Sequence, residues 1–191
     1  MRRAKMVRKT KETSISVAVN IDGSGDTKVK TGIKFLDHMV ASLSKHSMID
    51  VALEGKGDLV HHLVEDVAIT LGEALAKALG NRASIIRFGS ASVPMDDALA
   101  YAAVDLVKRP YSVIELKIDK DGIEDIPAED IYHFLQSLAT SMQANIHIIV
   151  KYGQNDHHKV EAGFKALALS MKQAYSIDVR RKGLPTLKGK M

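Results

Sequence analysis

A histidine pair followed by a glutamate occurs twice in this 191-residue sequence, as His61-His62-Leu63-Val64-Glu65 and as His157-His158-Lys159-Val160-Glu161. The two copies lie 96 residues apart (157 minus 61), and each opens a segment with helical apolar periodicity. A long internal repeat of this kind indicates that a supersecondary unit has been duplicated. We therefore expect two similar halves that carry the motif at the same place.

The order of the predicted elements agrees with a duplication. In the first half, apolar alternation predicts strands near residues 15–19, 27–31 and 49–53, and helical stripes predict helices at 33–46 and 61–79. In the second half we expect strands near 84–91, 98–107, 112–118 and 145–151, and helices after Pro127 and at 157–175. The second half thus has one strand more than the first. With a boundary at Gly80-Asn81, the predicted halves are residues 1–80 and 81–191 of an α+β fold in which helices cover each β-sheet.

Composition excludes several classes of protein. The chain is 46% hydrophobic and 26% charged, as globular proteins are, and it has no segment of about 20 apolar residues that could span a membrane. Because cysteine is absent, disulfides, thiolate zinc sites and cysteine nucleophiles are excluded. No apolar segment follows the basic N-terminus, so we expect a cytoplasmic protein.

The net charge of +4 is concentrated near the two ends of the chain. The basic residues there are Arg2, Arg3, Lys5, Arg8, Lys9 and Lys11 at one end, and Arg180, Arg181, Lys182, Lys188 and Lys190 at the other. Such ends can be solvated tails, or they can bind nucleic acid or a phosphorylated small molecule.

The spacing of the repeated motif is suited to metal binding. Positions i and i+3 or i+4 of a helix are neighbours, so each glutamate can share a metal with a preceding histidine. Adjacent histidines diverge by roughly 100° around the helix, so one pair could serve two different ions. The two histidines and the glutamate flank the apolar stripe of the helix, as expected for a metal held against another element or another subunit.

His38, on the first short helix, and His147, on the strand at 145–151, extend the ligand set. We predict eight ligands in two equivalent quartets: His38, His61, His62, Glu65, His147, His157, His158 and Glu161. This set fits two octahedral ions with open positions, and its lack of sulfur suits manganese, although zinc or iron could bind as well. His46 and His133 are expected to have ordinary or supporting roles. The alternative is that the paired histidines are accidental polar residues at two helix starts, and their duplication disfavours it.

Several segments, taken in order, resemble one family nearly end to end. They include residues 8–13, Phe35-Leu36-Asp37-His38-Met39, Arg87-Phe88-Gly89, residues 94–99, Arg109-Pro110-Tyr111, residues 155–162 and Thr186-Leu187-Lys188-Gly189, besides the two histidine motifs. The ordered set resembles the imidazoleglycerol-phosphate dehydratase family. The resemblance implies a fold of two tandem halves like the second domain of ribosomal protein S5. It also implies a lyase with two Mn²⁺ per active site, and a hollow homo-oligomeric shell of 24 subunits, built from trimers, with sites between subunits.

The implied reaction removes water from D-erythro-imidazole glycerol phosphate to give imidazole acetol phosphate in histidine biosynthesis. The proton to be lost lies on carbon beside the imidazole ring and is only feebly acidic. Metals on both ring nitrogens would let the imidazolate stabilise charge and help to expel the neighbouring hydroxyl. By its match to the family's glutamate, Glu12 is the candidate for proton transfer.

The resemblance also assigns the substrate phosphate to basic residues. Arg87 and Arg109 can clamp it bidentately, Lys188 can reach it as a point charge, and Thr186 adds a hydroxyl. This gives the basic C-terminal end a role without nucleic acid, and no aromatic interleaving supports a nucleic-acid partner. A membrane partner is not expected either.

At four positions the sequence departs from the family pattern: Ser42, Leu63, Asp97 and Leu187 stand where glutamine, threonine, glutamate and a small hydroxyl residue are usual. These changes affect expectations of substrate contacts and rate rather than of metal binding. Two other classes remain open at this point. One is a dinuclear metal hydrolase on the same scaffold, and the other is a nucleic-acid-binding module of the S5-like fold, whose binding would be salt-sensitive.

Overall fold

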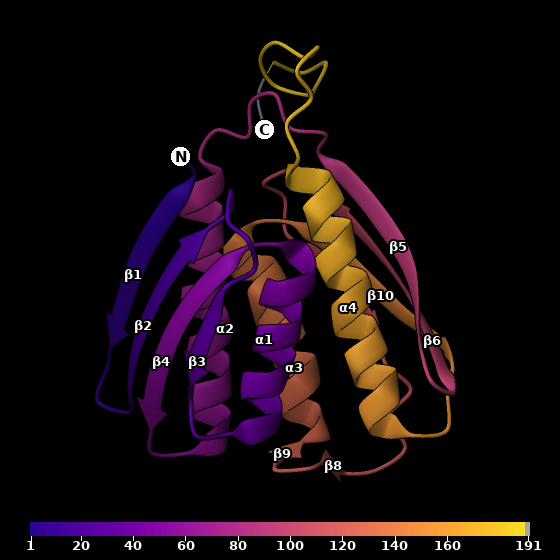
Figure 1. Cartoon of the computed structure of the whole chain (residues 1–191). Helices are drawn as coiled ribbons and strands as arrows, with labels where there is room; N and C mark the ends of the chain where they lie inside the picture. The colour runs from indigo at the N-terminus through magenta and orange to yellow at the C-terminus, as the bar shows by residue number, and fades with distance from the viewer. Residues whose placement is uncertain (190–191) are drawn as a thin grey trace.

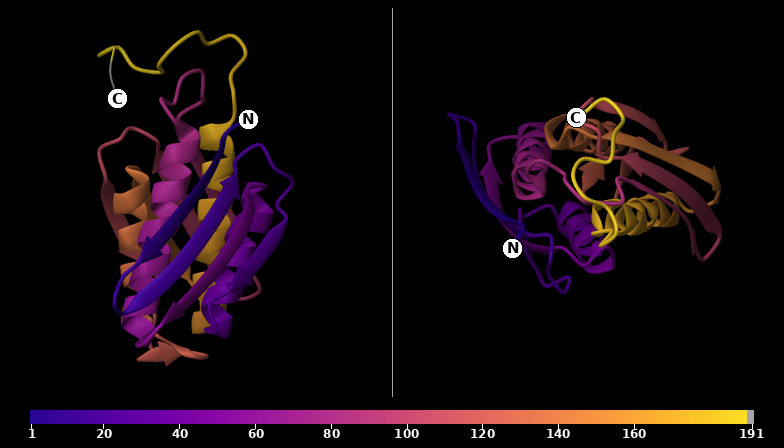
Figure 2. Two further views of the ribbon diagram at one scale, coloured as in Figure 1. Left: turned by 90° about the vertical axis from the view of Figure 1, so that its left-hand side faces the viewer. Right: turned by 90° about the horizontal axis from the view of Figure 1, so that it is seen from above.

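Two four-stranded sheets form the outer layers of the molecule, and four helices lie between them (Figures 1 and 2). The computed structural model describes residues 1–189, so that Lys190, one of the basic residues near the C-terminus, lies outside the described part. The first half contains β1 (Arg3–Lys9), β2 (Thr13–Asn20), β3 (Thr27–Lys30), α1 (Lys34–Ser47), β4 (Asp50–Gly57) and α2 (Val60–Leu79). The second half contains β5 (Phe88–Met95), β6 (Ala98–Asp105), β7 (Tyr111–Glu115), β8 (Gly122–Ile123), β9 (Ile126–Pro127), α3 (Ala128–Met142), β10 (Asn145–Tyr152) and α4 (Asp156–Tyr175).

The two sheets have the same topology. Their strand orders are β1-β2-β4-β3 and β5-β6-β10-β7. In each sheet the inner strand contributed last, β4 or β10, pairs antiparallel with one neighbour and parallel with the other. The predicted α+β fold of duplicated halves is confirmed.

Alternation along the strands directs one face of each sheet toward the helices. On β2, Ile15, Val17 and Val19 are at most 4% exposed, as expected for the inward side of a strand with period two. On β10, Ile146, Ile148 and Val150 are fully buried. The helices pack in pairs between the sheets, α2 on α3 and α1 on α4. At Gly72 of α2 an added Cβ would lie only 2.7 Å from Cβ of Ser141, so this glycine permits the close approach of α3.

The sequence prediction missed β1 and misplaced β5. Because Arg3, Lys5 and Lys9 are exposed, the segment resembles a basic tail, but Ala4 and Met6 alternate with them and pack against the core. A charged outer row of this kind is typical of edge strands, where it discourages pairing with other chains. Each half therefore has the same four-stranded sheet, and the expected surplus of one strand in the second half is wrong; β8 and β9 form a separate small hairpin.

The strand expected at 84–91 begins only at Phe88. Arg82, Ser84 and Arg87 all have positive φ, between 59° and 81°, which interrupts an extended strand. The strands expected at 98–107 and 112–118 end at Asp105 and Glu115. No helix within residues 1–189 has the length and apolar character needed to cross a membrane.

All four helices begin at the end of the molecule that carries the β8–β9 hairpin, and α4 ends near the C-terminal segment (Figure 1). The hairpin holds the first turn of α1, because the Asp125 carboxylate accepts hydrogen bonds from the main-chain N–H groups of Lys34 (2.6 Å) and Phe35 (2.9 Å). At the start of α4, the side chain of Asn155 accepts a hydrogen bond from N of His157 at 2.9 Å. These contacts fix the start of α1, which carries His38, and the start of α4, which carries the second copy of the repeated motif.

Candidate metal and substrate site

One cluster of possible metal ligands joins the two halves of the chain. His38 of α1 meets His157 and Glu161 of α4, and one ligand atom from each lies within 4.8 Å of the others. Nε2 of His38 is 3.6 Å from Oε2 of Glu161, and Nε2 of His157 is 3.4 Å from the same oxygen. We call these three residues the first triad. Imidazole nitrogens and a carboxylate oxygen at such distances fit a divalent transition-metal ion.

Lys165 orients the carboxylate of the first triad. Its Nζ lies 2.8 Å from Oε1 of Glu161, so that Oε2 is left to face the two histidines. Burial tends to raise the pKa of Glu161, but the hydrogen bond and charge of Lys165, followed by His38, outweigh it and lower that pKa. The carboxylate is therefore held in the ionised form that a metal ligand requires.

A second cluster is built from the complementary elements. His61 and Glu65 of α2 face His133 of α3, with 3.5 Å between Nε2 of His133 and Oε1 of Glu65. The ring centroids of His61 and His133 are 4.9 Å apart. We call these residues the second triad. Each triad therefore takes one histidine from the shorter helix of one half, and a histidine and a glutamate from the longer helix of the other half.

The second histidine of each pair points away from its neighbour. The ring centroids of His157 and His158 are 6.1 Å apart with planes at 80°, and those of His61 and His62 are 6.3 Å apart at 62°. Nδ1 of His62 lies 2.9 Å from Asp58, whose hydrogen bond raises the pKa of His62. The predicted divergence within each pair is present, and His62 and His158 are left for another contact.

Glu12 lies close to His62, with 3.8 Å between its Oε2 and Nδ1 of that histidine. The loop that carries Glu12 is tied to α2 through Asp66. This buried aspartate accepts hydrogen bonds from Nε of Arg8 at 2.6 Å and from the hydroxyl of Thr13. The structure thus brings the predicted proton-transfer residue to one of the predicted metal ligands.

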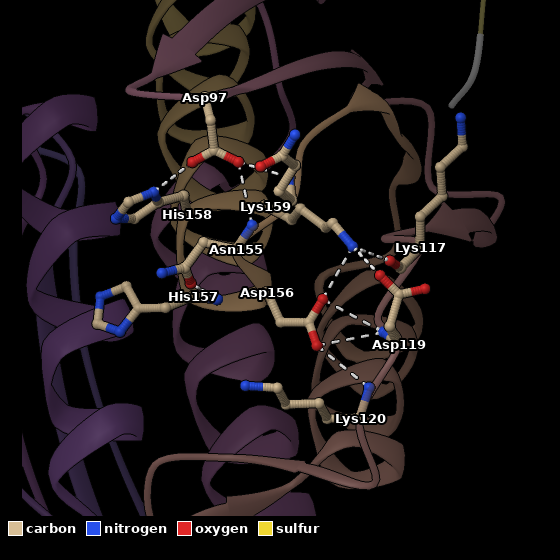
Figure 3. A network of polar contacts seen from close by, with 10 residues as sticks. Asp97, Lys117, Asp119, Lys120, Asn155, Asp156, His157, His158 and Lys159 are labelled. Atoms are coloured by element: carbon tan, nitrogen blue, oxygen red, sulfur yellow. Dashed lines mark hydrogen bonds and ion pairs between the residues drawn. The ribbon is translucent and has the colours of Figure 1, made fainter.

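An ionic network built on the buried pair of Lys159 and Asp156 anchors the start of α4 (Figure 3). Nζ of Lys159 contacts Oδ1 of Asp156 at 2.9 Å and the carbonyl oxygen of Lys117 at 2.7 Å, and it also binds Asp119. Asp156 accepts main-chain hydrogen bonds from Asp119 and Lys120 in turn. The segment at 117–120 is thereby fixed against the turn that presents His157 and His158.

On the other side of the same turn, Asp97 meets His158 (Figure 3). Oδ1 of Asp97 lies 2.6 Å from Nδ1 of His158, and Oδ2 accepts the main-chain N–H of Asn155 at 3.0 Å. The hydrogen bond from His158, followed by those from the main chain, holds the pKa of Asp97 well below its usual range. The departure from the family pattern at position 97 is therefore a residue that holds a histidine.

The structure does not bring His147 to either triad within one chain. Its neighbours Ile146 and Ile148 are buried against the helices, so His147 lies on the opposite face of the sheet, where its ring meets that of Tyr111 at 6.2 Å between centroids. His133, which was expected to have an ordinary or supporting role, lies beside Glu65 instead. The internal repeat contains the signal for this exchange, since His133 precedes His157 by 24 residues as His38 precedes His61 by 23.

The predicted phosphate-binding residues lie at the far end of the molecule from both triads. The main-chain N–H of Arg87 donates a hydrogen bond to the carbonyl oxygen of Ala174 at the end of α4. At a rise of 1.5 Å per residue, Ala174 lies about 25 Å along the helix from His157. The guanidinium of Arg87 pairs bidentately with Asp105 and donates to the carbonyl oxygen of Pro185 at 2.9 Å, so it anchors the segment that contains Thr186 and Lys188. Arg109 lies at the same end, between Lys108 and Tyr111, which bind the end of α3.

The other departures from the family pattern have modest structural roles. Ser42 is 8% exposed and Leu63 is 6% exposed, and both belong to the packed interior. Leu187 is fully exposed on the C-terminal segment.

Two hollows border the first triad, with volumes of about 390 and 350 Å³; they share Glu124 and His157 in their walls.

Comparison with known proteins places these features in a family. The family model for imidazoleglycerol-phosphate dehydratase matches residues 31–171. The imidazoleglycerol-phosphate dehydratase of Methanothermobacter thermautotrophicus is 50% identical over 194 aligned positions, covering 100% of this chain and 98% of the relative. That of Dehalococcoides mccartyi is 47% identical over 189 positions, covering 98% and 96%.

Solved structures agree with the sequence relatives. The enzyme of that name from Pyrococcus furiosus, in complex with (S)-C348, superposes with a TM-score of 0.84 at 37% identity, covering 97% of this chain and 100% of that one. The Staphylococcus aureus enzyme gives a TM-score of 0.85 at 27% identity, covering 92% and 99%. Fold, clustered side chains and relatives together define a hydro-lyase. The chain belongs to the imidazoleglycerol-phosphate dehydratase family and has a dehydratase function in histidine biosynthesis.

Proposed function

We propose that this chain dehydrates D-erythro-imidazole glycerol phosphate to imidazole acetol phosphate in a reaction that requires two Mn²⁺ per active site. The observation that carries the proposal is the pair of triads, each with two histidines and one glutamate, at the end of the molecule where the helices begin. The family name of the relatives supports the substrate class. The cysteine-free composition is compatible with the reducing conditions of the cytoplasm, where we place the protein.

The residues that would hold the metals are the first triad, the second triad, and His62 and His158. His147, predicted with them, lies on the outer face of its sheet, so we assign its place to His133. The imidazole and carboxylate donors fit manganese, and they also allow zinc or iron. When bound, the metals supply Lewis-acid stabilisation of negative charge on the substrate's imidazole ring.

Glu12 is the residue proposed to move the proton. Its carboxylate is 57% exposed and lies beside His62, so it can reach a substrate whose ring is held near that histidine. We propose that Glu12 takes the proton from the carbon beside the ring, as a general base in contact with the reacting atoms.

Arg87, Arg109, Thr186 and Lys188 are proposed to bind the phosphate. Arg87 contacts the end of α4 about 25 Å along that helix from His157, and the other three lie at the same end of the molecule; a molecule as small as imidazole glycerol phosphate cannot span that distance. The histidines of one chain must then be completed by the basic end of another chain. We therefore propose a homo-oligomer with active sites between subunits, and the family resemblance supports a shell of 24 subunits built from trimers.

The deciding experiment measures turnover of imidazole glycerol phosphate by metal-stripped protein, before and after Mn²⁺ is added. We expect imidazole acetol phosphate only after addition. Turnover of equal rate in both states would refute the metal requirement. Bound Mn²⁺ without any product would refute the proposed substrate and leave a different reaction to be sought at the same triads.

A further inference from the structure

All four paired histidines present Nδ1 to a carboxylate. The contacts are His61 with Asp130 at 2.6 Å, His62 with Asp58 at 2.9 Å, His157 with Glu124 at 3.1 Å, and His158 with Asp97 at 2.6 Å. The carboxylates come from α3, from the loop before α2, from the turn of the β8–β9 hairpin and from the turn between β5 and β6. Only the contact of Asp58 is between residues close in sequence, four positions apart, so the recurrence has no common local cause.

Two of these carboxylates have the features of built-in supports. The Asp130 side chain is 3% exposed, that of Asp97 is 33% exposed, and both lie 2.6 Å from their histidines. Asp58 and Glu124, by contrast, are more than half exposed. A buried carboxylate is costly unless it is paired, and the described hydrogen bond of the Asp130 side chain is the one with His61. The burial of the Asp130 carboxylate is therefore compensated only when the His61 ring is in this place.

The chemistry of the contact determines which nitrogen remains available. An ionised carboxylate only accepts hydrogen bonds, so Nδ1 of the histidine must carry the proton. In a neutral imidazole the lone pair then lies on Nε2. In the first triad the nitrogen of His157 that faces the glutamate of the cluster is indeed Nε2.

We infer that Asp130 and Asp97 are positioning residues that fix the tautomer and orientation of His61 and His158, so that Nε2 is the ligand atom of each. Each aspartate acts through the histidine ring that it holds. Asp97 also holds the main-chain N–H groups of Gln154 and Asn155, so it sets the ring and the preceding loop together. The inference rests on the metal binding proposed above.

The test uses Asp130→Asn and Asp97→Asn in the full-length protein. Asparagine keeps the shape of the side chain, but its NH₂ group can donate to Nδ1 and thus stabilises the opposite tautomer as well. The controls are Glu129→Gln, one residue before Asp130, and Asp121→Asn, because both positions are exposed and the substitutions remove the same charge.

Two readouts separate positioning from a general effect on the fold. Nitrogen-15 NMR of histidine-labelled, metal-free protein reports the tautomer, and calorimetry reports the dissociation constant for Mn²⁺. We expect the wild type and both controls to hold the protonated Nδ1 form, and each aspartate variant to show a mixture. We expect the dissociation constant of the affected site to rise about 10- to 100-fold in the aspartate variants and less than twofold in the controls.

A folded Asp130→Asn or Asp97→Asn protein that keeps both the wild-type tautomer and the wild-type dissociation constant would overturn the inference for that residue. If Asp130→Asn does not fold, the less buried Asp97→Asn decides. Neither readout uses the phosphorylated substrate. A wild-type protein that binds Mn²⁺ through these histidines without turning over imidazole glycerol phosphate would refute the proposed reaction and leave this inference intact.

Discussion

Nε2 of His133 lies 3.5 Å from Oε1 of Glu65, the same relationship that His38 has to Glu161 across the other pair of helices at 3.6 Å. The glutamate is the last residue of the repeated motif in each case, and the histidine comes from the shorter helix of the opposite half. The two triads therefore have the same composition and come from corresponding helices of the two halves.

Replacement of His133 by asparagine should lower the metal content by about half, because one of the two triads loses a ligand while the other is untouched. The matched variant His147→Asn, on the outer face of its sheet, should retain the wild-type content. Atomic absorption on both purified proteins after loading with Mn²⁺ measures the difference. Loss of metal in the His147 variant alone would show that His147, as the sequence predicts, and not His133, is the ligand.

Glu12→Gln should lower kcat by about 10²- to 10⁴-fold, the range typical for loss of a positioned acid–base group. Because Glu12 lies 3.8 Å from His62 without belonging to either triad, Mn²⁺ content should stay near that of the wild type. Steady-state kinetics and metal analysis on the same sample test this. A normal kcat would exclude Glu12 as the proton-transfer group.

Two inactive variants should restore activity to each other when they assemble together. One variant carries His157→Ala, and the other carries Arg109→Ala with Lys188→Ala at the opposite end of the fold. In a symmetric assembly of equimolar chains, about a quarter of the sites that draw on two chains receive both intact parts. The assay compares chains refolded together with chains mixed after assembly; a site contained in one chain would gain nothing in either case.

Lys159→Met should destabilise the protein by about 3–5 kcal/mol, because it leaves the Asp156 carboxylate buried without its cation. Asp119→Asn serves as the control, since that side chain is 78% exposed and its ion pair should contribute at most about 1 kcal/mol. Urea unfolding of both variants measures the free energies. Equal losses of unfolding free energy in the two variants would contradict the larger contribution expected of the buried ion pair.

The burial of Tyr175 should make the free energy of unfolding fall at alkaline pH. Burial raises its pKa to about 12, while a tyrosine in an unfolded chain titrates near 10. Between these values the unfolded chain loses the proton first. The free energy of unfolding is therefore unaffected below about pH 10 and falls as pH rises toward about 12, by at most about 1.4 kcal/mol per pH unit. Unfolding curves of wild type and Tyr175→Phe should differ in this slope; parallel pH profiles would contradict it.

Much of the fold was predictable because apolar periodicity is strong where an element is buried on one side. The stripe of α2 and the alternation of Ile146 and Ile148 on β10 are examples. The first strand was missed because an edge strand needs only Ala4 and Met6 on its inner side, and its outer lysines and arginines dominate the composition. The start of β5 was misplaced because positive φ angles at Ser84 and Arg87 have no signature in hydrophobicity.

The candidate site was predictable to the extent that it is local in sequence. The HHxxE spacing places Glu161 beside His157 within one helix. Contacts between helices are not encoded in such spacing, so the sequence pattern favours His147 over His133 and carries no local signal for the supporting roles of Asp130 and Asp97. The separation of the basic end from the histidines likewise appears only once α4 is seen to run between them.

The exchange of histidines between the halves makes each half depend on the other. A free-standing half would carry one short-helix histidine and one HxxxE pair that face different partners, so it could complete a triad only against a second half. Joining the halves in one polypeptide makes that encounter intramolecular, at an effective concentration on the order of millimolar. A half on its own would therefore need a second copy of itself, whereas in this chain the covalent link keeps α1 beside α4 and α2 beside α3.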